Sequence, residues 1–124
     1  MNVKNIFVEI RTLDESLRDF ADTYKKLAAG KRVPKKELLS FESVDVLRKF
    51  LTPKRLELLK LIRQEKPNSI YQLAKLAKRD VKSVSTDVNV LADIGMIDRT
   101  KSKAKRETIT PRVNFDKIRV EIAI

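Results

Sequence analysis

Cysteine and histidine are both absent from the 124 residues of this sequence. Without thiols or imidazoles the chain has no disulfide, no thiol nucleophile, no imidazole base and no zinc site built from cysteine and histidine. The carboxylates do not compensate, because pairs such as Asp87 with Asp93, or Asp14 with Glu15, are most simply explained as solvated charges on helices. We therefore expect a protein that is not an enzyme and that binds no metal or other cofactor.

Long apolar runs and aromatic clusters are missing as well. No stretch approaches the roughly 20 consecutive apolar residues that span a membrane, and the N-terminus lacks the apolar segment of a signal peptide. Five Phe and two Tyr, scattered through the chain, are too few to form a platform on which single-stranded bases stack. These absences predict a cytoplasmic protein with no membrane partner.

Positive charge is what the sequence has in excess. The formal net charge is +11 and the pI is near 10.0, so the field of the protein favours anionic partners such as nucleic acid, an anionic surface or an acidic protein. The excess is uneven, since residues 1–50 hold 11 basic and 8 acidic residues whereas residues 51–124 hold 17 and 9. The second half of the chain is therefore the part expected to meet an anionic partner.

Residues 69–97 predict two helices joined by a tight turn. Ser69 and Gln72 form a capping-box pair at the start of the first helix, and Asp80 is a suitable N-cap for the second. Gly95 ends the second helix, because glycine readily adopts the left-handed conformation found there. Each helix has apolar residues at helical spacing: Ile70, Leu73, Ala74 and Ala77 in the first, and Val84, Val88 and Leu91 in the second.

The second of these helices, residues 81–94, is expected to present a polar face away from the core. In a helix-turn-helix the second helix lies in the major groove of DNA, and residues near its N-terminus contact base edges. An ordinary helical hairpin whose polar face is merely solvated is the alternative. The outward side chains, which we take as candidates for base recognition, are Lys82, Ser83, Ser85, Thr86 and Asn89.

A basic hairpin is predicted directly after the second helix. Two β-like runs, residues 96–100 and 107–110, flank a tip in which five basic residues and no acidic one occur between Arg99 and Arg106. A hairpin behind a recognition helix is typical of a wing, and its cations suit phosphates; a solvated loop is the alternative. The candidates for contact with the DNA backbone are Ser69, Tyr71, Gln72, Lys78, Arg79, Arg99, Lys101, Lys103, Lys105 and Arg106.

The segment SIYQLAKLAKRDVKSVSTDVNVLADIGMIDR resembles the core of the MarR-like winged helix-turn-helix regulators of archaea and bacteria. With FESVDVLRKFLTPKRLELLKLI before it and PRVNFDKIRVEI after it, about two-thirds of the chain is similar to a small family of prokaryotic transcriptional regulators, some of them antitoxin-like. The resemblance implies a DNA-binding repressor. One departure is the turn, where many such proteins have glycine and this chain has Lys78, Arg79 and Asp80.

The remaining segments are expected to pack and to pair. Residues 3–11 alternate as a strand, residues 37–43 form a second strand candidate, and Thr52 followed by Pro53 starts a helix whose core stripe is Leu56, Leu59 and Ile62. The C-terminal alternating strand forms a small sheet with the other two, or an exposed edge that pairs with a second copy. The dimerisation candidates are Leu13, Leu17, Phe20, Tyr24 and Leu27, at intervals of four and three on a helix that Gly30 closes, and Ile118, Val120 and Ile122.

These observations predict an α+β fold. Residues 51–124 would form a winged helix-turn-helix core with a C-terminal strand, and residues 1–50 an N-terminal strand-helix extension that packs or dimerises. The expected function is sequence-specific binding of double-stranded DNA by a homodimeric transcriptional regulator. Two alternatives stay open: an antitoxin that autoregulates its operon and binds a protein toxin, and an architectural nucleic-acid binder without sequence preference.

Overall fold

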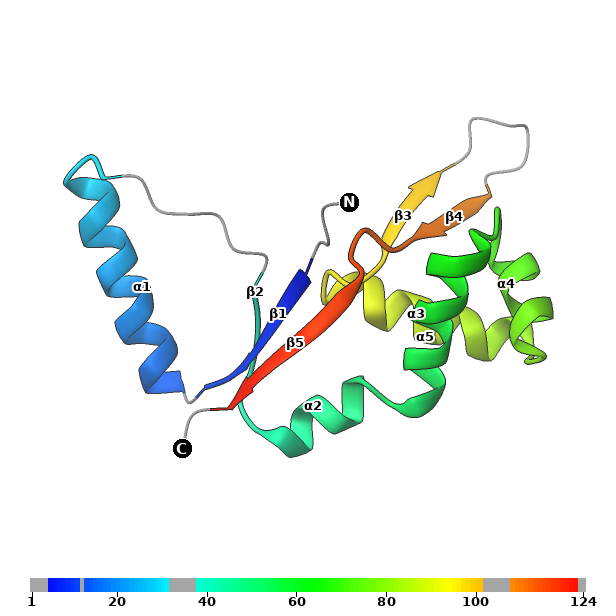
Figure 1. The fold of residues 1–124 in the computed structure, drawn as a ribbon, viewed down its shortest axis with the longest axis horizontal. Coiled ribbons are helices and arrows are strands. Elements are labelled where there is room, and N and C mark those ends of the chain that lie inside the picture. Colours follow the sequence, from blue (N-terminus) through cyan, green and yellow to red (C-terminus); the bar gives the residue numbers. More distant parts are fainter. Residues whose placement is uncertain (1–4, 12, 32–37, 102–107, 123–124) are drawn as a thin grey trace.

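The computed structural model describes residues 5–11, 13–31, 38–101 and 108–122, and it has the α+β composition that the sequence predicts. Figure 1 shows a three-stranded sheet in the middle of the molecule, with helix α1 on one side and helices α3 to α5 on the other. In chain order the elements are β1 (Asn5–Ile10), α1 (Leu13–Ala28), β2 (Leu38–Phe41), α2 (Val44–Phe50), α3 (Pro53–Glu65), α4 (Ile70–Ala77), α5 (Val81–Asp93), β3 (Asp98–Lys101), β4 (Ile109–Arg112) and β5 (Lys117–Ile122).

The sheet has the order β2-β1-β5, and both neighbours run parallel to β1. Val8 of β1 lies opposite Leu39 on one side and Val120 on the other. Because side chains alternate along a strand, Ile6 and Val8 share one face, and both are buried in the hydrophobic core. Of the two arrangements expected for the C-terminal strand, the structure shows the small sheet with the two N-terminal strands. This sheet also joins the two ends of the chain, so residues 1–50 contribute its central strand and are more than an extension.

Helices α3, α4 and α5 supply most of the core. Buried side chains come from one face of each: Leu58, Leu59 and Ile62 of α3, Leu73 and Ala74 of α4, and Val84, Val88 and Leu91 of α5. The predicted stripe of α3 is wrong at one position. Leu56 is 37% exposed while Leu58 is fully buried, because residues two apart on a helix point about 200° apart and cannot both face the same core.

The helix starts follow the predicted caps. The hydroxyl of Thr52 accepts a hydrogen bond from the backbone N–H of Arg55 at 3.2 Å, and Ser43 does the same for Val46 at the start of α2. At α4 the hydroxyl of the N-cap Ser69 accepts from the N–H of Gln72 at 3.0 Å, and the Gln72 amide oxygen accepts from the N–H of Asn68, one residue before the cap, at 2.7 Å. Thr12, which precedes α1, lies outside the described residues.

The hairpin of β3 and β4 is antiparallel, with Asp98 opposite Arg112 and Lys101 opposite Ile109. Its base is tied to the loop before α4, because Thr110 donates a hydrogen bond to the carbonyl of Asn68 at 2.8 Å and Arg112 donates to the carbonyl of Pro67 at 2.7 Å. The predicted basic tip, residues 102–107, lies outside the described residues. Within the described part of the chain no helix is long and apolar enough to cross a lipid bilayer.

Candidate nucleic-acid interface

The exposed face of α5 carries the side chains that the sequence singled out. Lys82, Ser83, Thr86 and Asn89 are exposed and Ser85 is half-buried, while Val84, Val88 and Leu91 on the opposite side are buried. Short hydroxyl and amide groups with one cation therefore line the outward side of the first three turns. These groups can donate and accept hydrogen bonds at a surface outside the helix.

The start of α5 is held by local hydrogen bonds. Asp80 is the N-cap, and its carboxylate accepts from the backbone N–H of Ser83 at 2.9 Å. This hydrogen bond is the main reason why the pKa of Asp80 lies below its usual range. One turn later the Thr86 hydroxyl donates to the carbonyl of Lys82 at 3.0 Å, so its oxygen remains able to accept a hydrogen bond from a ligand.

The turn between α4 and α5 closes without glycine. Lys78 adopts the left-handed conformation with φ +55°, and the N–H groups of Lys78 and Arg79 donate to carbonyls in the last turn of α4. A residue with a Cβ pays about 1–2 kcal/mol for this conformation. Lysine therefore adopts a conformation that glycine takes more easily, and its side chain is exposed.

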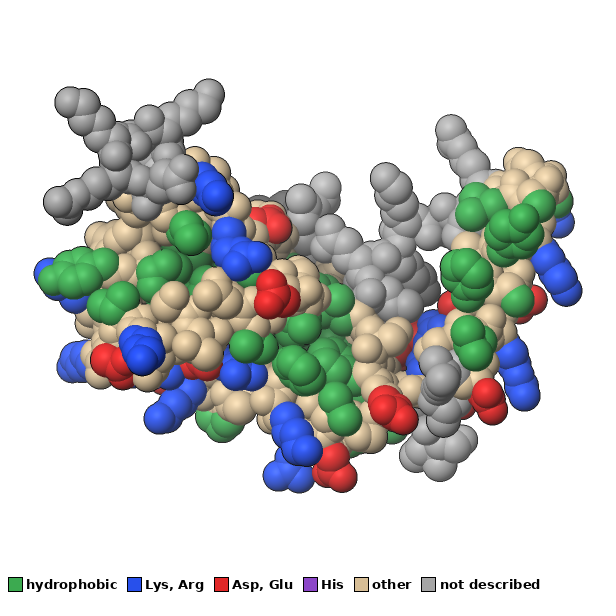
Figure 2. All heavy atoms as spheres, turned by 180° about the vertical axis from the view of Figure 1, so that it is seen from behind, with side chains coloured by type: hydrophobic (Ala, Val, Ile, Leu, Met, Phe, Trp, Pro, Cys, Tyr) green, Lys and Arg blue, Asp and Glu red, His purple; other side chains and the backbone are tan. Residues whose placement is uncertain are grey.

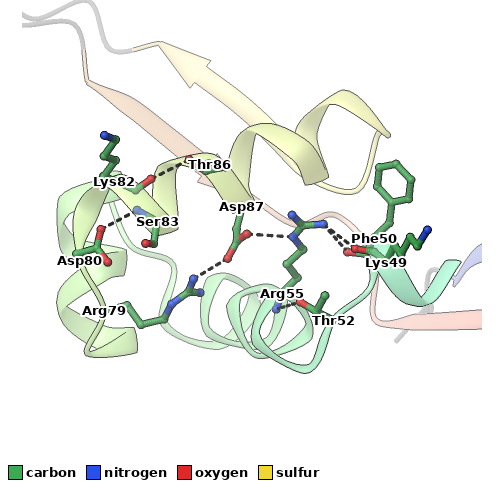
Figure 3. A network of polar contacts seen from close by, with 10 residues as sticks. All are labelled: Lys49, Phe50, Thr52, Arg55, Arg79, Asp80, Lys82, Ser83, Thr86 and Asp87. Atoms are coloured by element: carbon green, nitrogen blue, oxygen red, sulfur yellow. Dashed lines mark hydrogen bonds and ion pairs between the residues drawn. The ribbon is translucent and has the colours of Figure 1, made fainter. Parts of the chain in front are cut away.

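Asp87 lies on the inner side of α5, behind this surface, and connects the helix to neighbouring parts of the chain (Figure 3). Its two carboxylate oxygens accept from Arg55 at 3.0 Å and from Arg79 at 2.8 Å. Arg55 also donates to the carbonyls of Lys49 and Phe50 at 3.2 and 3.1 Å. A single carboxylate thus fixes α5 to the end of α2, the start of α3 and the turn that precedes α5.

The charge of Asp87 persists although the side chain is only 15% exposed. Burial acts to raise its pKa, but the hydrogen bonds from Arg79 and Arg55, together with their positive charges, outweigh burial and hold the pKa below its usual range. The expectation that Asp87 is a solvated helix charge is wrong. The signal was present in the sequence, because Asp87 lies three residues after Val84 and four before Leu91, at the edge of the buried stripe.

Several residues expected on the DNA backbone have contacts within the protein. Arg79 pairs with Asp87, and its side chain is 20% exposed. Arg99 of β3 reaches back to α5, where it donates to the amide oxygen of Asn89 at 2.9 Å and lies 3.5 Å from a carboxylate oxygen of Asp93. Ser69 and Gln72 cap α4. These four side chains shape the surface, and their polar groups are partly occupied.

The other predicted contacts are exposed or lie outside the description. Tyr71, Lys78 and Lys101 are exposed, and the ammonium of Lys75 lies 4.7 Å from the centre of the Tyr71 ring. Lys103, Lys105 and Arg106 belong to residues 102–107, which the structure does not describe. The described candidates gather on α4, the turn, α5 and the first strand of the hairpin.

Among the described residues, arginine and lysine differ in their contacts with the rest of the protein. Each recorded ion pair is made by an arginine, namely Arg11, Arg55, Arg63, Arg79 or Arg99. Each lysine that the structure describes is exposed. Guanidinium groups suit fixed, forked contacts with carboxylates, whereas an ammonium is a strongly hydrated point charge on a flexible stem. These five arginines therefore connect parts of the fold, and the described lysines supply positive charge at its surface.

A protein-family model described as HVO_A0114 matches residues 50–120. The chain belongs to the HVO_A0114 family. The part shared with this family contains α3, α4, α5, the hairpin and the start of β5, and with them Arg55, Arg79, Asp87, Asn89 and Arg99. No curated protein and no solved structure matches the chain significantly.

Membership of the HVO_A0114 family does not by itself identify an activity. In the described ranges no group of three or more Asp and Glu side chains is placed to hold a metal ion. The surface built on α5 instead has exposed hydrogen-bonding groups, a rigid ionic anchor behind them and unpaired ammonium groups around them. Such a surface is suited to binding a polyanion that also carries hydrogen-bonding edges.

Proposed function

We propose that this protein is a sequence-specific transcriptional regulator that binds double-stranded DNA through a winged helix-turn-helix. In this proposal α5 enters the major groove and the hairpin of β3 and β4 is the wing. The observation that carries the proposal is the outward face of α5, where Lys82, Ser83, Thr86 and Asn89 are exposed while Asp87 is clamped by two arginines on the inner side.

Base recognition requires short polar side chains in a fixed orientation. Asn89 is the best candidate, since an asparagine amide pairs with adenine in a bidentate manner and discriminates against other bases by about 1–3 kcal/mol. Its amide oxygen already accepts from Arg99, which orients the amide before DNA is bound. Thr86 and Ser83 lie about one turn and two turns towards the start of α5 and extend the same face along a groove.

Affinity is attributed to the exposed lysines. The net charge of the protein is +11, and five of the described arginines are engaged with carboxylates of the protein. Lys78, Lys82 and Lys101 surround the start of α5 and the wing, where phosphates would lie on either side of the groove. Their contribution is electrostatic and independent of sequence, so affinity and specificity come from different residues.

One recognition helix reads only a few base pairs, so we expect two copies to bind two half-sites related by a twofold axis. Half-sites one helical turn apart, about 10 base pairs, would match such a dimer. The regulator would act as a repressor by occupying its site, and this role implies a location in the cytoplasm, where the DNA of a prokaryotic cell lies.

The test is selection of bound duplexes from a random library, followed by competition between the selected site and bulk DNA at increasing salt. We expect a palindromic site that is retained at a salt concentration where bulk DNA is released. Asn89→Ala and Thr86→Ala should change the preferred bases, whereas Gln64→Ala, an exposed polar truncation on α3, should not. Binding without any enriched sequence would contradict the proposal and would indicate a non-specific binder.

A further inference from the structure

Helix α1 has an apolar face that the described part of the chain leaves uncovered. Leu17, Phe20, Tyr24 and Leu27 are 56–71% exposed, and Figure 2 shows hydrophobic side chains in a row along this helix. None of the described residues of α1 belongs to the hydrophobic core or packs against it. A continuous apolar stripe of this kind on a soluble surface marks a binding site for another protein surface.

The sheet of the same chain is a poor cover for this stripe. One face of the sheet packs on the helical core through Ile6 and Val8. By the register of the strands, the opposite face carries Phe7 among mainly polar side chains such as Glu9, Ser40 and Arg119. An ion pair between Arg11 and Asp19 at 2.9 Å attaches the first half of α1 to the end of β1. Within the described residues the stripe therefore remains uncovered.

We propose that the stripe of α1 pairs with α1 of a second copy in antiparallel orientation. The charges of the helix support this partner, because Asp14 and Glu15 lie in its first turn and Lys25 and Lys26 in its last. An antiparallel pair places each acidic end beside the basic end of the other helix. A parallel pair would bring like charges together, and the helix dipoles would also repel.

The spacing of the stripe fixes the register. Leu17, Phe20, Tyr24 and Leu27 follow intervals of three and four, which is the seam of a short coiled coil. With Phe20 on the twofold axis, Leu17 faces Tyr24 of the partner subunit, and Leu27 faces the first turn of the partner helix. The arrangement is isologous, so both copies use the same surface. The side chain of Leu13, which the same spacing assigns to the seam, lies outside the described residues.

Residues of β5 next to the start of α1 can add to the contact between the two copies. A cavity of about 450 Å³ separates the start of α1 from the end of β5, and Ile10, Glu15 and Ile122 line it. Ile122 and Val120 are themselves exposed. A helix of 16 residues is about 24 Å long, so the seam alone is at or below the roughly 1,200 Å² of the smaller specific interfaces. We therefore expect a reversible dimer.

This inference supplies the dimer on which the proposed reading of two half-sites rests. The dimer and the sequence-specific binding of DNA can fail separately, because the dimer is tested without DNA and sequence preference is tested by competition.

The first experiment is sedimentation of the full chain over a range of concentrations. The expected result is a monomer–dimer equilibrium that Phe20→Glu shifts at least 100-fold towards monomer, because the substitution places two carboxylates at the twofold axis. The circular dichroism of this variant should match that of the parent, since Phe20 packs on nothing in the core. Arg18→Glu is the control, because residue 18 points about 200° away from residue 20 on the same helix.

The second experiment determines orientation by disulfide trapping, which the absence of native cysteine makes unambiguous. In the antiparallel register the two copies of residue 17 lie about 10 Å apart along the seam, beyond the reach of a disulfide. Leu17→Cys should therefore not cross-link to itself, but it should cross-link to Tyr24→Cys when the two variants are mixed.

Four results would overturn the inference. A wild-type chain that stays monomeric, or a dimer of unchanged mass after Phe20→Glu, would exclude this surface as the dimer contact. Efficient self-cross-linking of Leu17→Cys would show a parallel pair. Stoichiometric purification of an unrelated chain, released by Phe20→Glu, would mean that a different protein covers α1.

Discussion

Replacing Asp87 by asparagine removes one negative charge and leaves the shape of the side chain almost unchanged. Two guanidinium groups, 17% and 20% exposed, would then face each other without a counter-ion. Removing one partner of a fully buried ion pair costs about 3–5 kcal/mol, whereas exposed pairs contribute about 0–1 kcal/mol. Asp87 lies between these limits, and asparagine keeps one acceptor oxygen. We expect Asp87→Asn to lower the free energy of unfolding by about 2 kcal/mol.

A loss of this size is measurable. It is a substantial part of the roughly 5–15 kcal/mol that stabilises a domain, and it corresponds to a fall in Tm of about 5–10 °C for a chain of this length. Urea unfolding at pH 7, followed by circular dichroism, gives the difference directly. Asp93→Asn is the matched control on the same helix, because Asp93 is exposed and its contact with Arg99 is 3.5 Å long. It should cost less than about 0.5 kcal/mol.

The pH dependence gives a second measurement of the same interaction. The pKa of Asp87 is lower in the folded protein than its usual value of 3.8, so ionised Asp87 stabilises the folded state above that value. As pH falls from about 4 through the folded pKa, the carboxylate is protonated and this stability is lost. The difference between wild type and Asp87→Asn should therefore shrink in acid. A difference below about 0.5 kcal/mol at pH 7, or one that is constant between pH 7 and pH 3, would refute the role assigned to Asp87.

Three further predictions concern the wing and the ends of helices. Replacing Lys101, Lys103 and Lys105 together by alanine should flatten the slope of log affinity against log salt by up to about 3, with similar losses for specific and random duplexes; an unchanged slope would show that the wing does not touch phosphate. Gly95→Ala should lower stability by about 1–2 kcal/mol in urea unfolding, because Gly95 has φ +89° and a Cβ there is strained by the backbone conformation and not by its nearest neighbour at 3.8 Å. Thr52→Ala should cost about 1 kcal/mol in the same assay by removing the N-cap of α3, and a loss below about 0.3 kcal/mol would indicate that Pro53 suffices to start the helix.

Local signals in the sequence were sufficient for the helices of the candidate site. The caps at Thr52, Ser69 and Asp80 each involve residues three positions apart, so both members of each contact are visible in a short window. The apolar stripe of α5 is equally local. The existence, limits and outward face of α4 and α5 could therefore be predicted before any tertiary contact was known.

Features that depend on distant parts of the chain could not be predicted in the same way. The alternation of residues 117–122 indicates a strand, but it contains no information on its partner or direction, and β5 pairs parallel with β1 from the other end of the sequence. For the same reason residues 1–50 were expected to form an N-terminal extension, although Val8 is fully buried in the centre of the sheet. The pairing of Asp87 with Arg55, 32 residues earlier, likewise required the fold.

Because the lysines are exposed and the ion pairs are made by arginines, chemical modification can change the surface charge without changing the stability of the fold. A reagent that acylates primary amines would neutralise the exposed lysines and leave every guanidinium intact. The chain should then lose its positive field in graded steps while the ion pairs of Arg55 and Arg79 with Asp87 persist. Colloidal behaviour and retention on an anionic resin would change with each step, and the unfolding midpoint would stay nearly constant.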